Sequence, residues 1–340
     1  MQAYIIRRLL LMIPTLIGIT VVCFGLIQLV PGGPVEEYIQ MVQSAATQSG
    51  ADPNRLLSQS EIENIRAYFG FDKPVHVRYW QWLTNILTGD FGESYVYRRP
   101  TLSVIIERMP ISLFFGLTSF LLSYSICIPL GMKKALRHGS KFDSISSFII
   151  FAGYVIPGYA LGILLILFFA GGSFFQFFPS GGIVSDYFEL LPLPAKISDF
   201  LHHMVLPLIC YMASEFAFLT MLMKNSMLDE TRKDYMRTAL LKGMDFETAA
   251  RRHALKNALL PIATRLSEIF TLMFAGALLI ERVFDIDGMG LLVWTSIVSR
   301  DYNVVLAIIF LTSLLTMIGR LFSDILYTMI DPRIQLGGKA

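Results

Sequence analysis

Six long apolar segments constrain what this chain can fold into. A helix of roughly 20 residues crosses a bilayer core of about 30 Å, and each segment is long enough to form one. Lipid offers no partners for backbone polar groups, so such a segment forms a helix in a membrane. The segments cover residues 9–30, 111–132, 145–170, 204–223, 262–280 and 304–326 of a 340-residue chain that is 54% hydrophobic. They predict an all-α integral membrane protein with six transmembrane helices.

The first apolar segment also resembles a secretory signal peptide, because Arg7 and Arg8 precede it. It is too long for a signal peptide, and no small-residue cleavage site follows it. We therefore expect it to be retained as a membrane span.

The distribution of basic residues predicts the orientation in the membrane. Residues 133–143 carry four Lys or Arg against one Asp, and residues 224–261 carry eight Lys or Arg. By the positive-inside rule both connections face the cytoplasm, and residues 171–203, which have more acid than base, face outward. Six spans then place both termini in the cytoplasm and the long connection 31–110 outside.

These boundaries divide the chain into three parts. Residues 1–100 hold the first transmembrane helix and a long external region, residues 101–328 form a five-helix core with a cytoplasmic loop at about 225–261, and residues 329–340 form a cytoplasmic tail. Within the external region, "SQSEIENIRAYFGFDKPVHVRYWQWLTNIL" predicts helix, turn and helix. Gly70 ends the first helix and Pro74 starts the second, while Trp80 and Trp82 suit an anchor at the membrane interface.

Four prolines lie inside the apolar segments and interrupt the hydrogen-bond ladder of a helix: Pro14, Pro129, Pro157 and Pro207. Membrane helices tolerate such breaks where neighbouring helices or a cavity satisfy the freed groups. We interpret them as kinks for packing, with a transport hinge as the alternative.

Charges inside apolar segments are costly in lipid and often functional. Glu215 has no Lys or Arg within a helical turn. It either lines an aqueous path that favours cationic substrates or bonds to a neighbouring helix. Two further pairs lie on single helix faces and are interpreted as structural ion pairs: Arg265 with Glu268, and Arg320 with Asp324.

Several classes of catalytic site are excluded. Cys23, Cys127 and Cys210 lack the spacing of a metal site, and His202 and His203 are adjacent, which points them to different sides of a helix. The chain has no HExxH motif, no nucleophile elbow and no GxxxxGK[ST] phosphate loop. We therefore expect no metal, no cofactor and no catalytic residues in this chain.

The segment "DYMRTALLKGMDFETAARRHALKNALLP", residues 234–261, is a charged hairpin in an otherwise apolar chain. Asp229 and Glu230 favour a helix start, and Gly243 can take the left-handed conformation that ends that helix. A second helix follows, with small residues at three- and four-residue spacing. Charge alone would allow a loop held at anionic headgroups. The small residues around a glycine turn favour a hairpin whose tip enters a groove of another protein.

This segment resembles the glycine-centred EAA loop of ABC importer permeases, in the variant form of the oligopeptide, dipeptide and nickel family. Arg237, Thr238 and Ala239 occupy the EAA positions, while Leu240 and Leu241 stand where relatives often have Arg and Ala. Other motifs of the family follow in the expected order along nearly the whole chain: "IIRRLLLMIPTL", "LVPGGP", "GFDKPVHVRYWQWL", "GDFGES", "IIERMPISL", "VIPGYALGILL", "LIERVFDIDGMGLL" and "DPRI". Within the family the sequence looks most like the Yej-type permeases of peptide importers, which also admit microcin C.

The resemblance implies a type I ABC importer permease fold in a bacterial inner membrane. It implies a second, homologous permease chain, ATP-binding subunits that carry ATP and Mg, and a periplasmic peptide-binding protein. The hairpin would seat in a groove of the ATPase, with these coupling residues: Tyr235, Arg237, Thr238, Ala239, Lys242, Gly243, Met244 and Asp245. An ion-coupled secondary transporter is one alternative, for which Glu215 is the main support. An intramembrane hydrolase is a second, but no span has a His in its middle.

Overall fold

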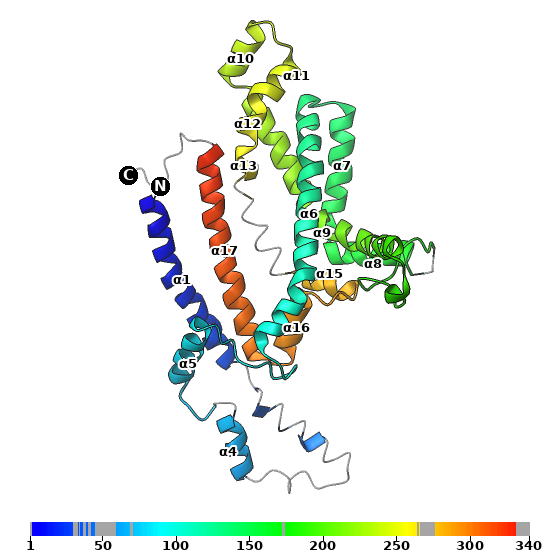
Figure 1. The fold of residues 1–340 in the computed structure, drawn as a ribbon. Coiled ribbons are helices and arrows are strands. Elements are labelled where there is room, and N and C mark those ends of the chain that lie inside the picture. Colours follow the sequence, from blue (N-terminus) through cyan, green and yellow to red (C-terminus); the bar gives the residue numbers. More distant parts are fainter. Residues whose placement is uncertain are drawn as a thin grey trace. The chain divides into compact units, whose positions relative to one another are not determined.

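A computed structural model describes residues 2–29, 33, 35–36, 39, 42–44, 59–68, 71–171, 174–263, 265 and 276–330. These residues form helices joined by turns, with no β-strand among them (Figure 1). The main helices are α1 (Gln2–Leu29), α4 (Gln59–Tyr68), α5 (Val75–Leu87), α6 (Thr101–Leu136), α7 (Lys141–Val155), α8 (Gly158–Phe169), α9 (Leu193–Thr231), α10 (Asp234–Leu241), α11 (Phe246–Ala249), α12 (Leu255–Ala258), α13 (Leu260–Ala263), α15 (Leu278–Val283), α16 (Met289–Val298) and α17 (Tyr302–Ile330). The all-helical prediction is confirmed for these residues.

The helices form two compact units. The first comprises Met1–Ile6, Met109–Leu291 and Leu315–Ala340, and the second comprises Arg7–Arg108 and Leu292–Leu314. The predicted three-part division stays a prediction.

In the second unit, α5 packs on α1 through aromatic rings. Phe24 of α1 lies edge-on to Tyr79 at 5.5 Å and is tilted against Trp82 at 5.9 Å. The hydroxyl groups of Thr20 and Tyr79 are 3.0 Å apart. Pro74 stands immediately before α5, as predicted. Gly70 lies outside the described residues.

In the first unit, α6 and α9 touch at a glycine. A Cβ at Gly131 would lie 2.6 Å from the carbonyl oxygen of Thr220, so only glycine fits there. In the same unit, the side chain of Glu281 in α15 is fully buried. Its carboxylate accepts hydrogen bonds from the Leu291 N–H at 2.8 Å and the Ala277 N–H at 3.1 Å. These bonds fix the turn between α15 and α16.

Three helices are long and apolar enough to cross a membrane: Tyr4–Leu29, Thr101–Leu136 and Tyr302–Ile325. The number rises to five if two bent pairs each count as one span. The predicted segment 262–280 falls mostly on residues 266–275, outside the described ones. Six spans and the cytoplasmic termini therefore stay predictions.

Only one of the two bends has a proline at the break. Between α7 and α8 the chain turns by 98° at Pro157, which has no N–H and holds Ile156 in an extended conformation. The predicted segment 145–170 is therefore not one straight helix. In α9 the 50° bend falls between Ala213 and Glu215, several residues beyond Pro207. Pro14, Pro129 and Pro207 lie inside helices.

Candidate functional site

Residues 234–261 form the predicted hairpin, which projects beyond the ends of α6 and α7 in the first unit (Figure 1). α10 ends at Leu241 with Lys242 as its C-cap, and Gly243 follows with a φ of +88°. Nothing lies within 4 Å of a Cβ added at Gly243. The left-handed backbone, and not lack of space, therefore requires glycine at this turn.

Asp245 starts the second arm of the hairpin. Its carboxylate accepts a hydrogen bond from the Thr248 N–H at 2.9 Å, which caps α11. This hydrogen bond lowers the pKa of Asp245 below its ordinary value. A single π-helical turn, Ala250–Ala254, follows and leads into α12. The turn chemistry of Gly243 and Asp245 thus defines the tip of the hairpin.

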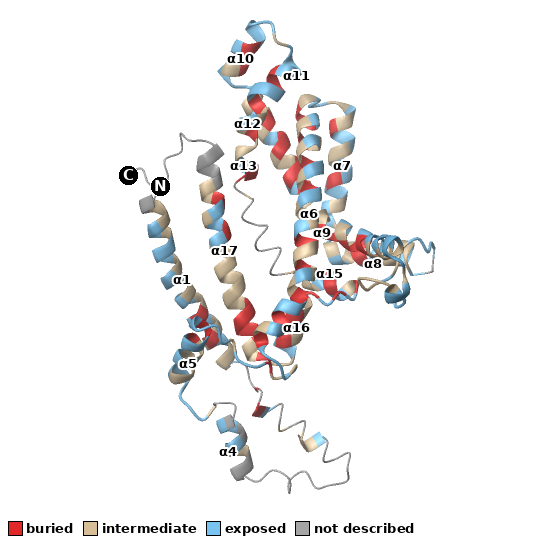
Figure 2. Cartoon of the chain, in the orientation of Figure 1, coloured by how far each residue is buried: buried red, intermediate tan, exposed pale blue. Residues whose placement is uncertain are grey.

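The inner face of the hairpin is built from alanines that are fully buried against α9 and α10. They belong to one core cluster with three methionines, Met223, Met227 and Met236. The alanines are Ala249, Ala250, Ala254 and Ala258. Small side chains let helices approach closely. The hairpin is therefore packed tightly on the end of α9 (Figure 2).

The predicted coupling residues separate into two groups. The exposed group contains Arg237, Thr238, Lys242, Gly243 and Asp245. Ala239 is buried, and Tyr235 is half-buried. The Tyr235 hydroxyl donates a hydrogen bond to Glu230 and lies 3.4 Å from the amide nitrogen of Asn257. Burial and the bond to Glu230 raise the pKa of Tyr235 to about 12. Met244 is half-buried beside the core cluster. Ala239 and Tyr235 thus support the hairpin from inside.

Exposed apolar side chains at the hairpin tip were missed by sequence reasoning. The side chain of Leu241 is 89% exposed, and Leu240 and Phe246 are also exposed. Two consecutive leucines beside charged residues and just before the glycine turn were the available signal. An apolar tip with Arg237 and Lys242 beside it suits contact with another protein better than contact with water.

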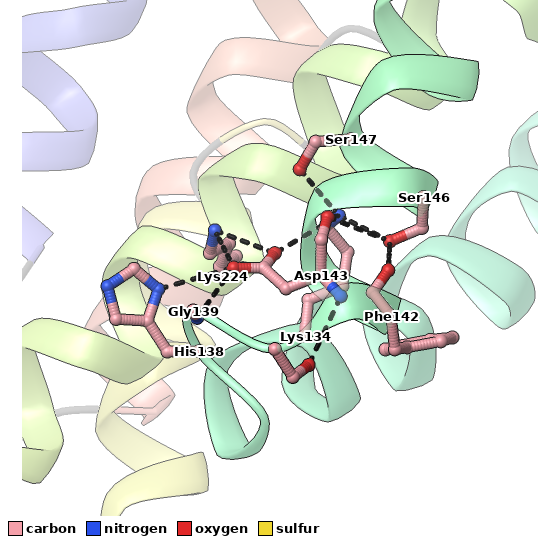
Figure 3. Close-up of polar contacts among 9 residues, drawn as sticks. Lys134, His138, Gly139, Phe142, Asp143, Ser146, Ser147 and Lys224 are labelled. Carbon is pink, nitrogen blue, oxygen red and sulfur yellow. Dashed lines mark hydrogen bonds and ion pairs between the residues drawn. The ribbon is translucent and has the colours of Figure 1, made fainter.

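Below the hairpin, a buried ionic cluster joins three helices (Figure 3). Asp143 of α7 lies 2.8 Å from the Nζ of Lys224 in α9 and 3.3 Å from the Nζ of Lys134 in α6. Lys134 also donates to the hydroxyl groups of Ser146 and Ser147, at 2.7 and 2.8 Å. One carboxylate thus faces two lysines in a buried site, and the remaining donors of Lys134 go to the Asp143 carbonyl and the two serine hydroxyl groups.

The local sequence explains why Asp143 points into this cluster. Ser140 caps α7 by accepting a hydrogen bond from the Asp143 N–H, and the Asp143 carboxylate accepts one from the Gly139 N–H at 3.2 Å. An acidic residue in the first turn of a helix also favours the helix dipole. His138 lies 3.3 Å from the same carboxylate. From the sequence alone, Lys134, Asp143 and Lys224 indicated only the charge of cytoplasmic connections.

Glu215 lies beside a basic residue from another part of the chain. Glu215 and Arg265 line one cavity of about 20 Å³, which is room for about one water. The guanidinium of Arg265 lies 4.3 Å from the ring centre of Phe218. Glu268 lies outside the described residues, so its pairing with Arg265 stays a prediction.

The second predicted ion pair is at the end of α17. Asp324 accepts a hydrogen bond from the Tyr4 hydroxyl at 2.9 Å, and Arg320 is exposed. Pairing of Arg320 with Asp324 stays a prediction. Among the described residues, no group of three or more His, Cys, Asp or Glu side chains could hold a metal ion.

Apolar helices and a firmly seated hairpin with an exposed tip suit a membrane transport subunit of the permease class. The chain belongs to the family described as the binding-protein-dependent transport system inner membrane component, which it matches over residues 127–336. Residues 1–116 match the N-terminal component of the same systems. The protein is therefore an inner-membrane permease of an ABC importer.

Curated relatives cover the chain from end to end. An inner membrane ABC transporter permease protein YejB of Escherichia coli O157:H7 is 41% identical, with 100% of both chains covered. A peptidoglycan transport system permease protein YejB of Agrobacterium fabrum is 40% identical, with 98% of both covered. An oligopeptide transport system permease protein AppB of Bacillus subtilis is 35% identical, with 98% of this chain and 100% of that protein covered. The likeness to Yej-type permeases is thus confirmed.

Proposed function

We propose that this chain moves peptides across the inner membrane from periplasm to cytoplasm, driven by ATP that separate subunits hydrolyse. Relatives named for oligopeptide and peptidoglycan transport support the substrate class. The sequence has no phosphate-binding loop of its own, so the ATP and Mg belong to partner subunits. The chain itself is not catalytic.

The observation that carries the proposal is the contrast between the two faces of the 234–261 hairpin. Its inner face is fixed to α9 by fully buried alanines, while its tip exposes Leu241 and Phe246. A rigid connection on one side and an apolar docking surface on the other are what a mechanical coupling element needs. The tip would seat in a groove of the ATP-binding subunit.

Movement of the hairpin has a physical route into the helices. α9 runs from the hairpin past Lys224, which is bonded to Asp143 of α7, to the bend before Glu215. A force on the hairpin would therefore act on α6, α7 and α9 together, because Lys134 ties α6 to the same carboxylate. The bend in α9 is where such a movement would be absorbed.

The partners follow from the family. A binding-protein-dependent ABC importer works with ATP-binding subunits and a periplasmic binding protein, and we further propose a second homologous permease chain that completes a heterodimer. Peptide-nucleotide compounds of the microcin C type are a proposed extension of the cargo. An ion-coupled transporter is disfavoured because family membership and the hairpin both point to an ATPase.

Peptide uptake in a strain that lacks this chain tests the proposal. We expect uptake of a labelled tripeptide to fall on deletion, to return with the wild-type chain, and to stay low when the partner ATPase carries a Walker lysine substitution. Uptake that survives ATP depletion and follows the proton gradient instead would overturn the proposal in favour of an ion-coupled transporter.

A further inference from the structure

The second unit contains a cavity of about 220 Å³ that the coupling mechanism does not use. It lies between α1, α5, the turn at residues 90–95 and the start of α17. Aromatic rings form much of its wall, among them Phe24, Phe71, Trp82 and Phe91. Much of the rest of the wall is polar and includes Gln28, Gln81, Asn85, Asp90 and Asn303, so the cavity combines aromatic surface with groups that can fix the orientation of a ligand.

The walls of the cavity are held in place by bonds within the unit. Arg78 donates to the side-chain oxygen of Gln28 at 2.7 Å, which joins α5 to α1. Gly92, with a φ of +72°, is fixed by a hydrogen bond from its N–H to Asp90 at 2.9 Å. Asn303 of α17 donates to the Glu93 carbonyl at 2.8 Å. The cavity is thus preformed.

Two N–H donors in the cavity wall have no acceptor. They are the Nε of Arg78 and the indole Nε1 of Trp82, and both atoms are buried. The two residues are four apart on α5, so they lie on the same face of that helix. Buried donors are almost always satisfied, so two unpaired donors on residues that line one cavity call for an explanation, and a bound acceptor is one.

Arg78 is the cation in this wall, and the same wall also holds one carboxylate, that of Asp90, which accepts from the Gly92 N–H. Arg78 forms no ion pair with any described residue, and its guanidinium lies 4.5 Å from the ring centre of Phe71. A guanidinium that lies over an aromatic ring and has an unpaired N–H can bind a ligand's carboxylate, because both groups are planar and of opposite charge. The Trp82 N–H can donate to the second oxygen of the same carboxylate or to the carbonyl next to it.

We propose that this cavity is a subsite for the free C-terminal carboxylate of a short peptide. The carboxylate binds between Arg78 and Trp82, and the terminal side chain packs against Phe24 and Phe91. The cavity is smaller than the roughly 300–1,000 Å³ of sites for whole drug-sized ligands, so it holds the end of a chain and not a whole oligopeptide. This inference rests on the proposed function, because it takes a peptide as the cargo.

Calorimetric titration of the purified full-length protein in nanodiscs tests this subsite. The probes are alanyl-alanyl-phenylalanine and the same tripeptide with a C-terminal amide. We expect the free acid to bind at least tenfold more tightly than the amide, and we expect this ratio to approach one in Trp82→Phe and Arg78→Gln. Trp82→Phe removes only the unpaired N–H, so it should leave the melting temperature unchanged or higher. Arg66→Gln, an equal loss of charge on the exposed side of α4, should keep the wild-type ratio.

Equal binding of acid and amide by the wild-type protein, or an unchanged ratio in a folded Trp82→Phe variant, would overturn the subsite. Displacement of the peptide by inorganic phosphate at the same concentration would also overturn it, since the site would then take any anion. Uptake assays separate this failure from that of the proposed function. If uptake of both tripeptides does not depend on the chain, the proposed function in peptide transport is wrong. If uptake depends on the chain while both variants leave the acid-to-amide ratio unchanged, only the subsite is wrong.

Discussion

The Nζ of Lys224 lies 2.8 Å from the carboxylate of Asp143, which ties α9, the helix that carries the hairpin, to α7. A second lysine, Lys134, approaches the same carboxylate from α6 and has no exposed side-chain surface. Two buried cations therefore depend on one anion. Loss of the Asp143 carboxylate would therefore leave both lysines without their anion.

Replacement of Asp143 by Asn should destabilise the first unit. The change leaves two lysines without a counter-ion in a buried site, at a cost on the order of 3 kcal/mol. We expect a lower melting temperature in detergent and lower peptide uptake. Asp186→Asn, at an exposed position in the connection before α9, is the matched control and should behave like the wild type. A melting temperature unchanged by Asp143→Asn would contradict the role of the cluster.

Replacement of Leu241 by Ser should weaken docking of the ATP-binding subunit without affecting the fold. The side chain is 89% exposed in the isolated chain, so its removal costs little until a partner covers it. Co-purification of the ATP-binding subunit should fall at least tenfold at an unchanged melting temperature. Leu190→Ser changes a leucine that is 87% exposed elsewhere and should leave co-purification intact. Equal co-purification with both variants would remove Leu241 from the interface.

Glu215 and Arg265 line one small cavity, and this arrangement allows the two roles of Glu215 to be separated. If Glu215 faces the transport path, Glu215→Gln should lower uptake of cationic peptides more than that of neutral ones. We expect this unequal effect in competition assays with tripeptides that differ only in one Lys. An equal loss for both peptides, recovered in the double variant with Arg265→Gln, would assign Glu215 to local charge balance.

The hairpin was predictable because its signals are local. Gly243 and the spacing of the alanines each act within a few residues, and the structure has the turn and the buried alanine face where they predict them. The helix start predicted at Asp229 and Glu230 is wrong, because both residues lie in the last turn of α9 and α10 begins at Asp234. The cap at Asp245 was not predicted. The break at Pro157 was signalled by a single residue. Its angle of 98° was not, because the angle depends on packing against α9.

Relationships between distant residues could not be predicted. Asp143 and Lys224 are 81 positions apart, and no periodicity within either helix indicates that they meet. The bend of α9 at Ala213–Glu215 contains neither proline nor glycine. Trp82 packs on Phe24 of α1 and Trp80 is exposed, a difference that their spacing in the sequence does not predict, while their place at a membrane interface stays a prediction. Each of these outcomes is decided by tertiary contacts.

The most direct test of the account is peptide-stimulated ATP hydrolysis by the reconstituted importer with substitutions at Gly243. A φ of +88° is strained for a β-branched residue but tolerated by Asn, and the position has open space for either side chain. We predict that Gly243→Val abolishes peptide uptake and the stimulation of ATP hydrolysis while membrane insertion persists, and that Gly243→Asn retains both. Wild-type uptake by Gly243→Val would contradict the claim that this hairpin transmits the energy of ATP hydrolysis to the transport helices.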